Sequence, residues 1–318
     1  MNSVQTNWLC RTGVIVALIF ACGIKNTVFA SEFLEALTKT PESRKTSSGV
    51  NYKLYSNVSY SGAEQNQLMD VYLPNNTKPT PCPAVLIIHG GGWTGGDKAD
   101  PRERAFAELM IDEGYVAVSV NYTLTAFEGA AWKSKRLKGS WPQNIYDCKS
   151  ALRWMKKNAD VLGIDQNRIA VMGGSAGGHL ALLTGLSAEN EPLNSGGSLL
   201  DQNNSVRCII DFYGIPDIRR WGGSSFIDES RQEHPEIWAL ASPVEHLSKK
   251  APPILIIHGT ADATVKIELS NEFVEILKAK SIPHQYVVIE NAAHSFGLQP
   301  PQMNLIPVVQ QFLKENFE

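Results

Sequence analysis

Arg168–His179, with the sequence RIAVMGGSAGGH, joins two segments whose patterns favour different secondary structures. The range 168–172 is a short apolar run with β-branched residues, which is typical of a buried strand. From Ala176 onward, the sequence AGGHLALLTGL has apolar residues at helical spacing. Only a tight turn centred on Ser175 can connect the two segments. We therefore predict a strand, a sharp elbow and a helix, in that order.

The turn reads Gly173-Gly174-Ser175-Ala176-Gly177, a G-x-S-x-G pattern. Side chains two positions before and after the serine would collide in a strand-to-helix elbow, and both positions hold glycine. The elbow presents the Ser175 hydroxyl outward, and N–H groups at the start of the helix face an oxyanion formed on the attacked group. With these residues in this context, the sequence resembles the α/β-hydrolase family, in which such a serine is the nucleophile.

A second glycine-rich segment, HGGGWTGGDK at 89–98, follows the unbroken apolar run 84–89. Such a run suits a strand that is covered on both faces. A glycine-rich loop after a strand first suggests phosphate binding. The spacing excludes a P-loop, because Asp97 precedes Lys98 where the pattern requires Gly-Lys followed by Ser or Thr.

The HGGG pattern instead resembles the oxyanion loop of esterases and lipases of the α/β-hydrolase fold. This resemblance implies that Gly91, Gly92 and Ala176 supply backbone N–H groups to the oxyanion. Two aromatic residues, Trp93 and Tyr122, are expected to contact the substrate. Trp93 adjoins the oxyanion loop, where it narrows the acyl pocket, stacks on an aromatic acid or simply packs in the interior; the sequence leaves these alternatives open.

A serine hydroxyl needs a neutral imidazole to accept its proton and a carboxylate to fix the tautomer of that imidazole. In α/β-hydrolases the order along the chain is serine, acid, histidine, and Ser175, Asp262 and His294 satisfy it. Each of them follows a predicted strand, which places all three at the carboxyl edge of the sheet, where open α/β sheets bind their ligands. We therefore expect them to form a catalytic triad.

Other residues compete for the acid and base roles. Asp262 is preferred because HGTAD followed by Val265 resembles the acid loop of the family, which often has proline where Lys266 stands. His294 is preferred because it lies in the loop after the last predicted strand. His179 is tied to the helix after the elbow, so we expect a structural role for it. The competing residues are Asp211, Asp217, His89, His179, His258 and His284.

Predicted strands and helices alternate along the chain, which indicates a mostly parallel, twisted sheet with helices on both faces. We expect an α/β fold of the α/β-hydrolase type, in one domain over 31–318. Two cap-like insertions are expected at about 123–141 and 214–250. The first contains four basic residues and two tryptophans, and we interpret it either as a cover over the mouth of the site or as a solvated loop.

The first thirty residues have the pattern of an export signal. Arg11 precedes an uncharged apolar run at 13–23, and Val28-Phe29-Ala30 offers small residues at the positions that a signal peptidase reads. We expect a signal peptide over 1–30 and a secreted or periplasmic protein, since the apolar run is too short for a permanent membrane anchor. Lipoprotein processing at Cys22 is the alternative.

Composition excludes several classes of partner and cofactor. A net charge of −3 without long charged blocks gives no reason to expect a nucleic acid, and no stable membrane partner is expected. Cys82, Cys148 and Cys208 form no C-x-x-C pair, so no zinc site is indicated and at most one disulfide can form. The resemblance implies a reaction without cofactor or metal.

The resemblance covers nearly all of 31–318 and is closest to secreted ferulic-acid-esterase-like and acetyl-esterase-like enzymes, related to the hormone-sensitive-lipase group through HGGG. It implies a serine esterase acting on short or aromatic acyl esters, with acyl groups on plant polysaccharides as the expected substrates. A general short-chain carboxylesterase is the main alternative. A serine peptidase is less favoured because the chain has no room for a propeller domain, and a non-catalytic binding protein because the triad is whole.

Overall fold

The computed structural model describes residues 40–61, 67–75, 81–128, 135–222 and 225–318. Residues 40–318 form one compact unit. The signal peptide predicted at 1–30 and the lipoprotein site at Cys22 lie outside the described residues. Across the ranges that are described, none of the helices combines the length and the hydropathy that crossing a bilayer requires.

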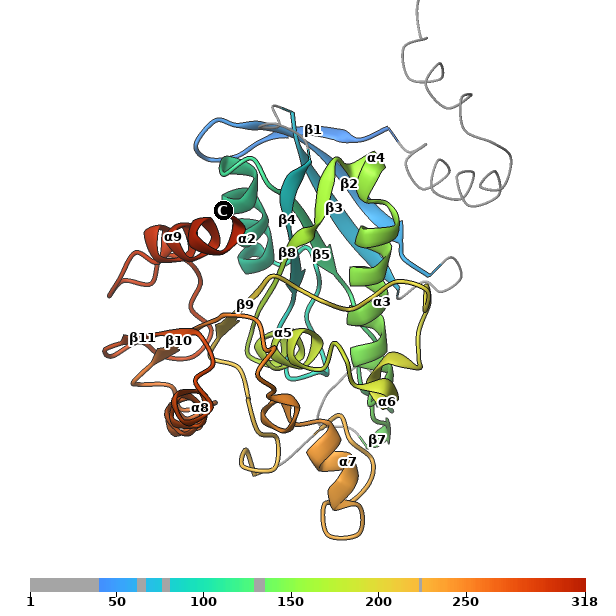
Figure 1. The fold of residues 1–318 in the computed structure, drawn as a ribbon, viewed down its shortest axis with the longest axis vertical. Helices are drawn as coiled ribbons and strands as arrows, with labels where there is room; N and C mark the ends of the chain where they lie inside the picture. The colour runs from blue at the N-terminus through green and yellow to red at the C-terminus, as the bar shows by residue number, and fades with distance from the viewer. Residues whose placement is uncertain (1–39, 62–66, 76–80, 129–134, 223–224) are drawn as a thin grey trace, which may run out of the picture. The chain divides into compact units, whose positions relative to one another are not determined.

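Nine strands form one sheet in the order β1-β2-β3-β5-β4-β8-β9-β10-β11 (Figure 1). Pairings from β1 to β5 are antiparallel, and all pairings from β5 through β4 to β11 are parallel. This confirms the predicted mostly parallel sheet. The strands are β1 (Glu42–Lys45), β2 (Asn51–Ser59), β3 (Leu68–Pro74), β4 (Cys82–Ile88), β5 (Val116–Val120), β8 (Ile164–Gly174), β9 (Cys208–Phe212), β10 (Ile254–Gly259) and β11 (His284–Ile289).

Helices cover both faces of this sheet. The first face carries α2 and α9, while α3 and α5, which contact each other, lie on the opposite face (Figure 1). Parallel strands need crossover connections, and α2, α3 and α5 lie in such connections, whereas α9 follows the last strand. The helices are α2 (Pro101–Asp112), α3 (Gln143–Lys157), α4 (Ala159–Leu162), α5 (Ala176–Leu186), α6 (Glu191–Asn194), α7 (Pro235–Leu240), α8 (Glu268–Ala279) and α9 (Ile306–Phe317).

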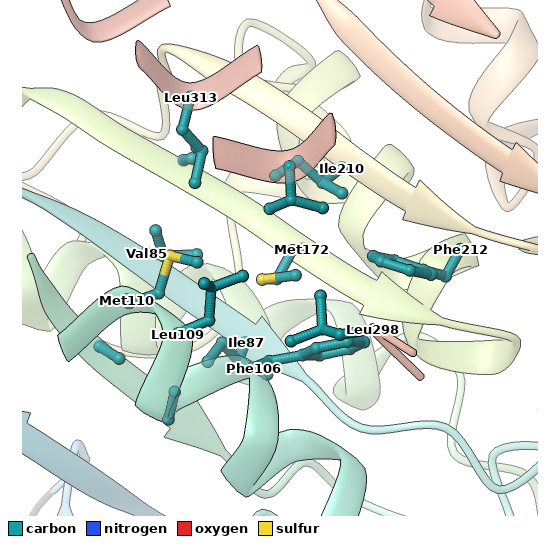
Figure 2. Packing of buried hydrophobic residues seen from close by; sticks show 14 of the residues in the cluster. Val85, Ile87, Phe106, Leu109, Met110, Met172, Ile210, Phe212, Leu298 and Leu313 are labelled. Atoms are coloured by element: carbon teal, nitrogen blue, oxygen red, sulfur yellow. The ribbon is translucent and has the colours of Figure 1, made fainter. Parts of the chain in front are cut away.

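Alternate residues of β4 show how the sheet is buried on both sides. Val85 and Ile87 belong to a hydrophobic cluster that includes Phe106 of α2 and Leu313 of α9 (Figure 2). Their neighbour Leu86 is equally inaccessible but lies outside that cluster, because successive side chains of a strand point to opposite faces. Burying one such side chain stabilises a fold by about 1.5–3 kcal/mol, so the continuous apolar run follows from the two helical layers.

Residues 142–163 have apolar residues at helical spacing, which predicts one long helix, but the structure divides this segment in two. α3 ends at Lys157, and Asn158 has φ −104° and ψ 17° before the short helix α4 begins. The Asn158 side chain donates to the Trp154 carbonyl over 2.8 Å. Asparagine side chains compete for backbone groups in this way, which explains the break. α4 then ends at Leu162, and the residue after it, Gly163, has a φ of 68°, which suits glycine.

Two further features were not expected from the sequence. β1 reads ESRK and is largely exposed, so it has no apolar alternation that would predict a strand. Within the insertion 123–141, β6 (Ala126–Phe127) pairs antiparallel with β7 (Arg136–Lys138) in a separate two-stranded sheet. Both features are stabilised by hydrogen bonds between backbones, so the sequence contains little apolar patterning that would predict them.

The carboxyl ends of the parallel strands lie at one edge of the sheet, and the loops with the predicted site residues leave from that edge. The loop 89–98 follows β4, the elbow at 173–177 follows β8, and the loops from 260 and from 290 follow β10 and β11. The topology therefore brings together segments that are far apart in sequence.

Candidate active site

The elbow adopts the strained geometry that its glycines permit. Ser175 has φ 59° and ψ −123°, and its N–H donates to the Phe212 carbonyl over 2.9 Å. A Cβ on Gly173 would lie 2.4 Å from the Gly177 carbonyl oxygen, and one on Gly177 would lie 2.1 Å from the Ile88 carbonyl oxygen. Glycine two positions before and after the serine is therefore a steric requirement, as the sequence indicated.

Ser175, Asp262 and His294 lie in a connected line. Nε2 of His294 is 2.9 Å from the Ser175 Oγ, and Nδ1 is 2.7 Å from the Asp262 Oδ2. Because an ionised carboxylate only accepts hydrogen bonds, the imidazole proton belongs on Nδ1, which leaves Nε2 to accept from the serine hydroxyl. The His294 side chain is 14% exposed and that of Asp262 is fully buried, so the imidazole faces the pocket while the carboxylate lies behind it.

The Asp262 carboxylate is held in its ionised form. The N–H groups of Thr264 and Val265 donate to Oδ1 over 2.9 and 2.8 Å, and Nε2 of His258 lies 3.3 Å from Oδ2. Burial by itself raises the pKa of this carboxyl group. Hydrogen bonds from His258, His294 and the Val265 amide outweigh that effect, so the pKa of Asp262 lies well below its ordinary value.

The competing acids have other partners. Asp217 accepts from the guanidinium of Arg219 over 2.8 Å, on the insertion 214–250. Asp211 lies buried at the end of β9, where one oxygen accepts from the Gly214 N–H and the other has no hydrogen-bond partner among the described residues. Burial raises the pKa of Asp211 to about 7, against the opposing charge of His258. Neither the Asp217 nor the Asp211 carboxylate therefore has the contacts that would orient the His294 imidazole.

The competing histidines are occupied within the interior. His89 stacks on Tyr122 with ring centroids 4.3 Å apart, and its Nδ1 lies 2.7 Å from the Gly90 carbonyl oxygen. His258 contacts the Ser270 hydroxyl and the Val265 carbonyl, at 2.7 and 2.8 Å. The structure thus brings His294 to the serine, while His89 packs against Tyr122 and Nε2 of His258 lies beside the Asp262 carboxylate.

The expected oxyanion donors line a pocket of about 280 Å³ together with Ser175 and His294. Within the described part of the chain, the N–H groups of Gly91, Gly92 and Ala176 donate to no protein acceptor. Gly91 and Gly92 have φ of 108° and 61°, and a Cβ on Gly91 would lie 2.2 Å from the Gly95 carbonyl oxygen. Glycine is thus favoured at both positions of this tight loop, which lines the pocket.

The two aromatic residues expected at the substrate differ in position. Trp93 lines the pocket but is fully buried, with Phe226 packed against it at a centroid distance of 4.3 Å. Tyr122 does not line the pocket: it lies beneath the oxyanion loop and donates its hydroxyl to the His89 carbonyl over 3.1 Å. The expected substrate contact of Tyr122 is therefore corrected to a supporting one, because the chain after β5 turns its ring toward His89.

The sequence did not single out five residues that line the pocket. One of them, Arg102, donates to the Tyr213 hydroxyl over 3.0 Å and to the Glu103 carboxylate. Tyr213 in turn donates to the Phe296 carbonyl and packs against the His294 ring at 4.8 Å. Arginine in the first turn of a helix carries no signal of such a role. The five residues are Arg102, Ile215, Trp221, Thr264 and Ser295.

The insertions 123–141 and 214–250 bind each other and the oxyanion loop. Thr125 N–H donates to the Trp93 carbonyl over 2.9 Å, and the Ser225 hydroxyl donates to the Gly92 carbonyl over 2.8 Å. The described part of 123–141 contributes no pocket-lining residue, so its contacts there are supporting ones. Further bonds between the insertions join Thr125 to Ser225, Trp141 to Phe226, Arg136 to Ile227 and Gly139 to Asp228.

No group of three or more histidine, cysteine or acidic side chains among the described residues is arranged to hold a metal ion. Cys82, Cys148 and Cys208 are free and buried.

The strand order together with the serine elbow makes this protein an α/β-hydrolase. Residues 69–277 match the BD-FAE family model, and the chain belongs to this family. Among its relatives, esterase LipC of Mycobacterium tuberculosis is 31% identical over 252 residues, which cover 74% of this chain and 59% of LipC. The chain likewise spans 57% of LipQ and 54% of LipM, so it is similar to only part of each of these proteins.

Solved structures show the same fold. A truncated carbohydrate esterase from gut microbiota superposes with a TM-score of 0.72 at 23% identity, over 83% of this chain and 96% of that one. Esterase 2 of Thermogutta terrifontis with bound propionate gives a TM-score of 0.64 at 27% identity, over 87% of this chain and 94% of that one.

Proposed function

We propose that this protein is a serine-dependent carboxylic-ester hydrolase in which Ser175 is the nucleophile, His294 the general base and acid, and Asp262 the residue that orients His294. The observation that carries the proposal is the continuous line from the Ser175 Oγ through both nitrogens of His294 to the Asp262 carboxylate. Its similarity to esterases of the same fold supports this assignment.

The geometry supports a two-step reaction. Ser175 Oγ bonds to the ester carbonyl carbon as its proton moves to Nε2 of His294. The N–H groups of Gly91, Gly92 and Ala176 stabilise the resulting oxyanion. The ester C–O bond then breaks, and His294 returns the proton to the leaving alcohol. In the second step a water molecule gives a proton to Nε2 of His294 and attacks the carbonyl carbon of the acyl-serine ester. The bond from this carbon to Ser175 Oγ then breaks, His294 returns the proton to Oγ, and the acid is released.

Short or aromatic acyl groups on plant polysaccharides are the substrates that we propose, as in acetylated xylan or feruloylated arabinoxylan. The pocket of about 280 Å³ is small, and a related esterase has been solved with propionate and with butyrate bound, which supports a short acyl group. The resemblance to ferulic-acid-esterase-like enzymes supports a polysaccharide. Export through a signal peptide over 1–30 would place the enzyme where such polymers occur.

The first experiment measures hydrolysis of p-nitrophenyl acetate by the wild type and by Ser175→Ala. We expect the variant to lose nearly all activity, and equal turnover by the two proteins would remove the proposed nucleophile. The substrate proposal is tested by a chain-length series of esters beside acetylated xylan and methyl ferulate. Better turnover of long-chain esters than of these substrates would favour a lipase and contradict the polysaccharide proposal.

A general short-chain carboxylesterase is the alternative to a polysaccharide esterase. It is favoured by the similarity to LipC and to the Thermogutta esterase, neither of which is described as acting on a polysaccharide. Efficient turnover of simple acetate esters with no gain on acetylated xylan would select this alternative.

A further inference from the structure

The reaction determines on which side of the pocket the alcohol of the ester lies. His294 protonates the leaving oxygen, so the alcohol must lie next to Nε2 of this residue, while the acyl carbonyl points to the N–H groups of the oxyanion loop. On the side of the acid and the base, the pocket lining includes Thr264, two residues after Asp262, and Ser295, the neighbour of His294. Both of these residues are exposed.

We propose that Trp221, Thr264 and Ser295 form the alcohol subsite and that the indole of Trp221 is a platform for a saccharide ring. All three line the pocket that contains Ser175, and Trp221 is partly exposed. A tryptophan offers a broad apolar face to the C–H groups of a sugar ring, and the hydroxyls of Thr264 and Ser295 can exchange hydrogen bonds with sugar hydroxyls. The assignment of a sugar rests on the proposed polysaccharide-ester function.

Several contacts hold Trp221 in place. Its indole N–H donates to the Thr264 carbonyl over 3.3 Å, and its ring packs edge-on against Trp93 with centroids 5.2 Å apart. The preceding residue, Arg220, pairs with Glu272 of α8 at 2.7 Å. A ring fixed before the substrate arrives loses little conformational freedom on binding, so its contact contributes more to affinity.

The charge of the pocket favours a neutral alcohol. Among the described residues that line it, Arg102 alone carries a permanent charge. Glu103 accepts from this guanidinium over 2.9 and 2.5 Å, which neutralises the charge next to the site. An uncharged pentose or hexose ring therefore fits this subsite better than an anionic sugar.

The experiment compares three esters of the same acid: ethyl acetate, cyclohexyl acetate and a mono-acetylated methyl xyloside. Trp221→Leu removes the flat ring but keeps apolar bulk. We expect kcat/KM to fall by about tenfold on the two ring esters, the size of effect known for aromatic contacts, and to change by less than about threefold on ethyl acetate. The matched control is Trp238→Leu, because Trp238 lies in the same insertion, donates to the Glu229 carbonyl and does not line the pocket.

Trp221→Phe keeps an aromatic ring and should retain most of the preference for ring esters, even if the leucine variant folds poorly. Equal losses on all three esters, or no loss on any, would overturn the platform. The wild type tests the polysaccharide proposal separately. If the wild type hydrolyses cyclohexyl acetate better than the xyloside ester, the assignment of a sugar as the alcohol is wrong. A loss of activity confined to the ring esters in Trp221→Leu would still show that the indole of Trp221 binds a ring-shaped alcohol.

Discussion

The indole N–H of Trp93 donates to Nδ1 of His179 over 3.2 Å, and Nε2 of His179 lies 2.8 Å from the Ala241 carbonyl oxygen. An acceptor at Nδ1 and a donor at Nε2 define one neutral tautomer. Burial lowers the pKa of His179 to about 4, which the carbonyl of Ala241 only partly offsets, so this tautomer persists at neutral pH. His179 thus joins the oxyanion loop, the helix after the elbow and the insertion 214–250.

Replacing His179 with leucine should therefore impair the oxyanion loop as well as the fold. The indole N–H of Trp93 would be left unpaired in the interior, which costs about 1–3 kcal/mol of unfolding free energy. Misplaced loop N–H groups should lower kcat by roughly 10²-fold with little change in KM, since loss of one oxyanion donor has effects of this order. Urea unfolding and steady-state kinetics measure both effects. A loss of stability with an unchanged kcat would show that His179 contributes to packing and does not position the oxyanion loop.

Asp262→Asn should leave the fold intact and reduce kcat by up to roughly 10⁴-fold, because an amide at this position favours the wrong imidazole tautomer. Asp217→Asn is the matched control, since its partner Arg219 lies on the insertion. Far-ultraviolet circular dichroism and esterase kinetics check both variants. A large loss in Asp217→Asn with little loss in Asp262→Asn would show that the acid is misassigned.

Activity should fall in acid, because a general base must be neutral before it can accept the proton of Ser175. The lowered pKa of Asp262 keeps its carboxylate ionised as pH falls, so protonation of Asp262 does not contribute to this loss of activity. The same shift stabilises the fold above the ordinary pKa of 3.8, and that stabilisation is lost as pH falls toward the lower folded value. A kcat/KM profile with parallel circular dichroism tests this, and a flat profile through mild acid would argue against His294.

Buried Lys149 should make stability depend on alkaline pH. Its ammonium donates to the Ser187 carbonyl and the Asn194 side chain, both neutral, and burial lowers its pKa from 10.5 to about 7. Between these values the unfolded chain binds more protons, so the cost of burying the charge is present below pH 7 and disappears as pH rises to 10.5. The unfolding free energy of the wild type, relative to Lys149→Met, should rise by a few kcal/mol across this range. A constant difference would contradict the pKa shift.

Gly177→Ala should destabilise the protein at the elbow, although alanine is a better helix former than glycine. Helix propensity favours alanine by about 1 kcal/mol, but the new Cβ would lie 2.1 Å from the Ile88 carbonyl oxygen. We expect a loss of several kcal/mol in unfolding free energy, or no folded protein. Gly95→Ala is the control, because a Cβ there meets no atom within 4 Å. Equal thermal stability of both variants would refute this steric explanation.

Much of the fold was readable because its elements obey simple patterns. Buried parallel strands such as β4 are unbroken apolar runs, and the helices between them have apolar residues at helical spacing. The interruption at Asn158 was missed because a single side chain bonded to the Trp154 carbonyl does not alter that spacing. β1 was missed because its polar residues pair only through the backbone.

By itself, the sequence determined the alternation of strands and helices, the glycines of the elbow and the oxyanion loop, and the chain order of Ser175, Asp262 and His294. These follow from local sterics and from the rule that ligands lie at the carboxyl ends of parallel strands. Only the tertiary structure decided that Tyr122 supports His89 and that Trp221 reaches the pocket. Both residues lie in irregular segments, where no periodicity constrains a side chain and contacts with distant residues, such as that of Trp221 with Thr264, set its position.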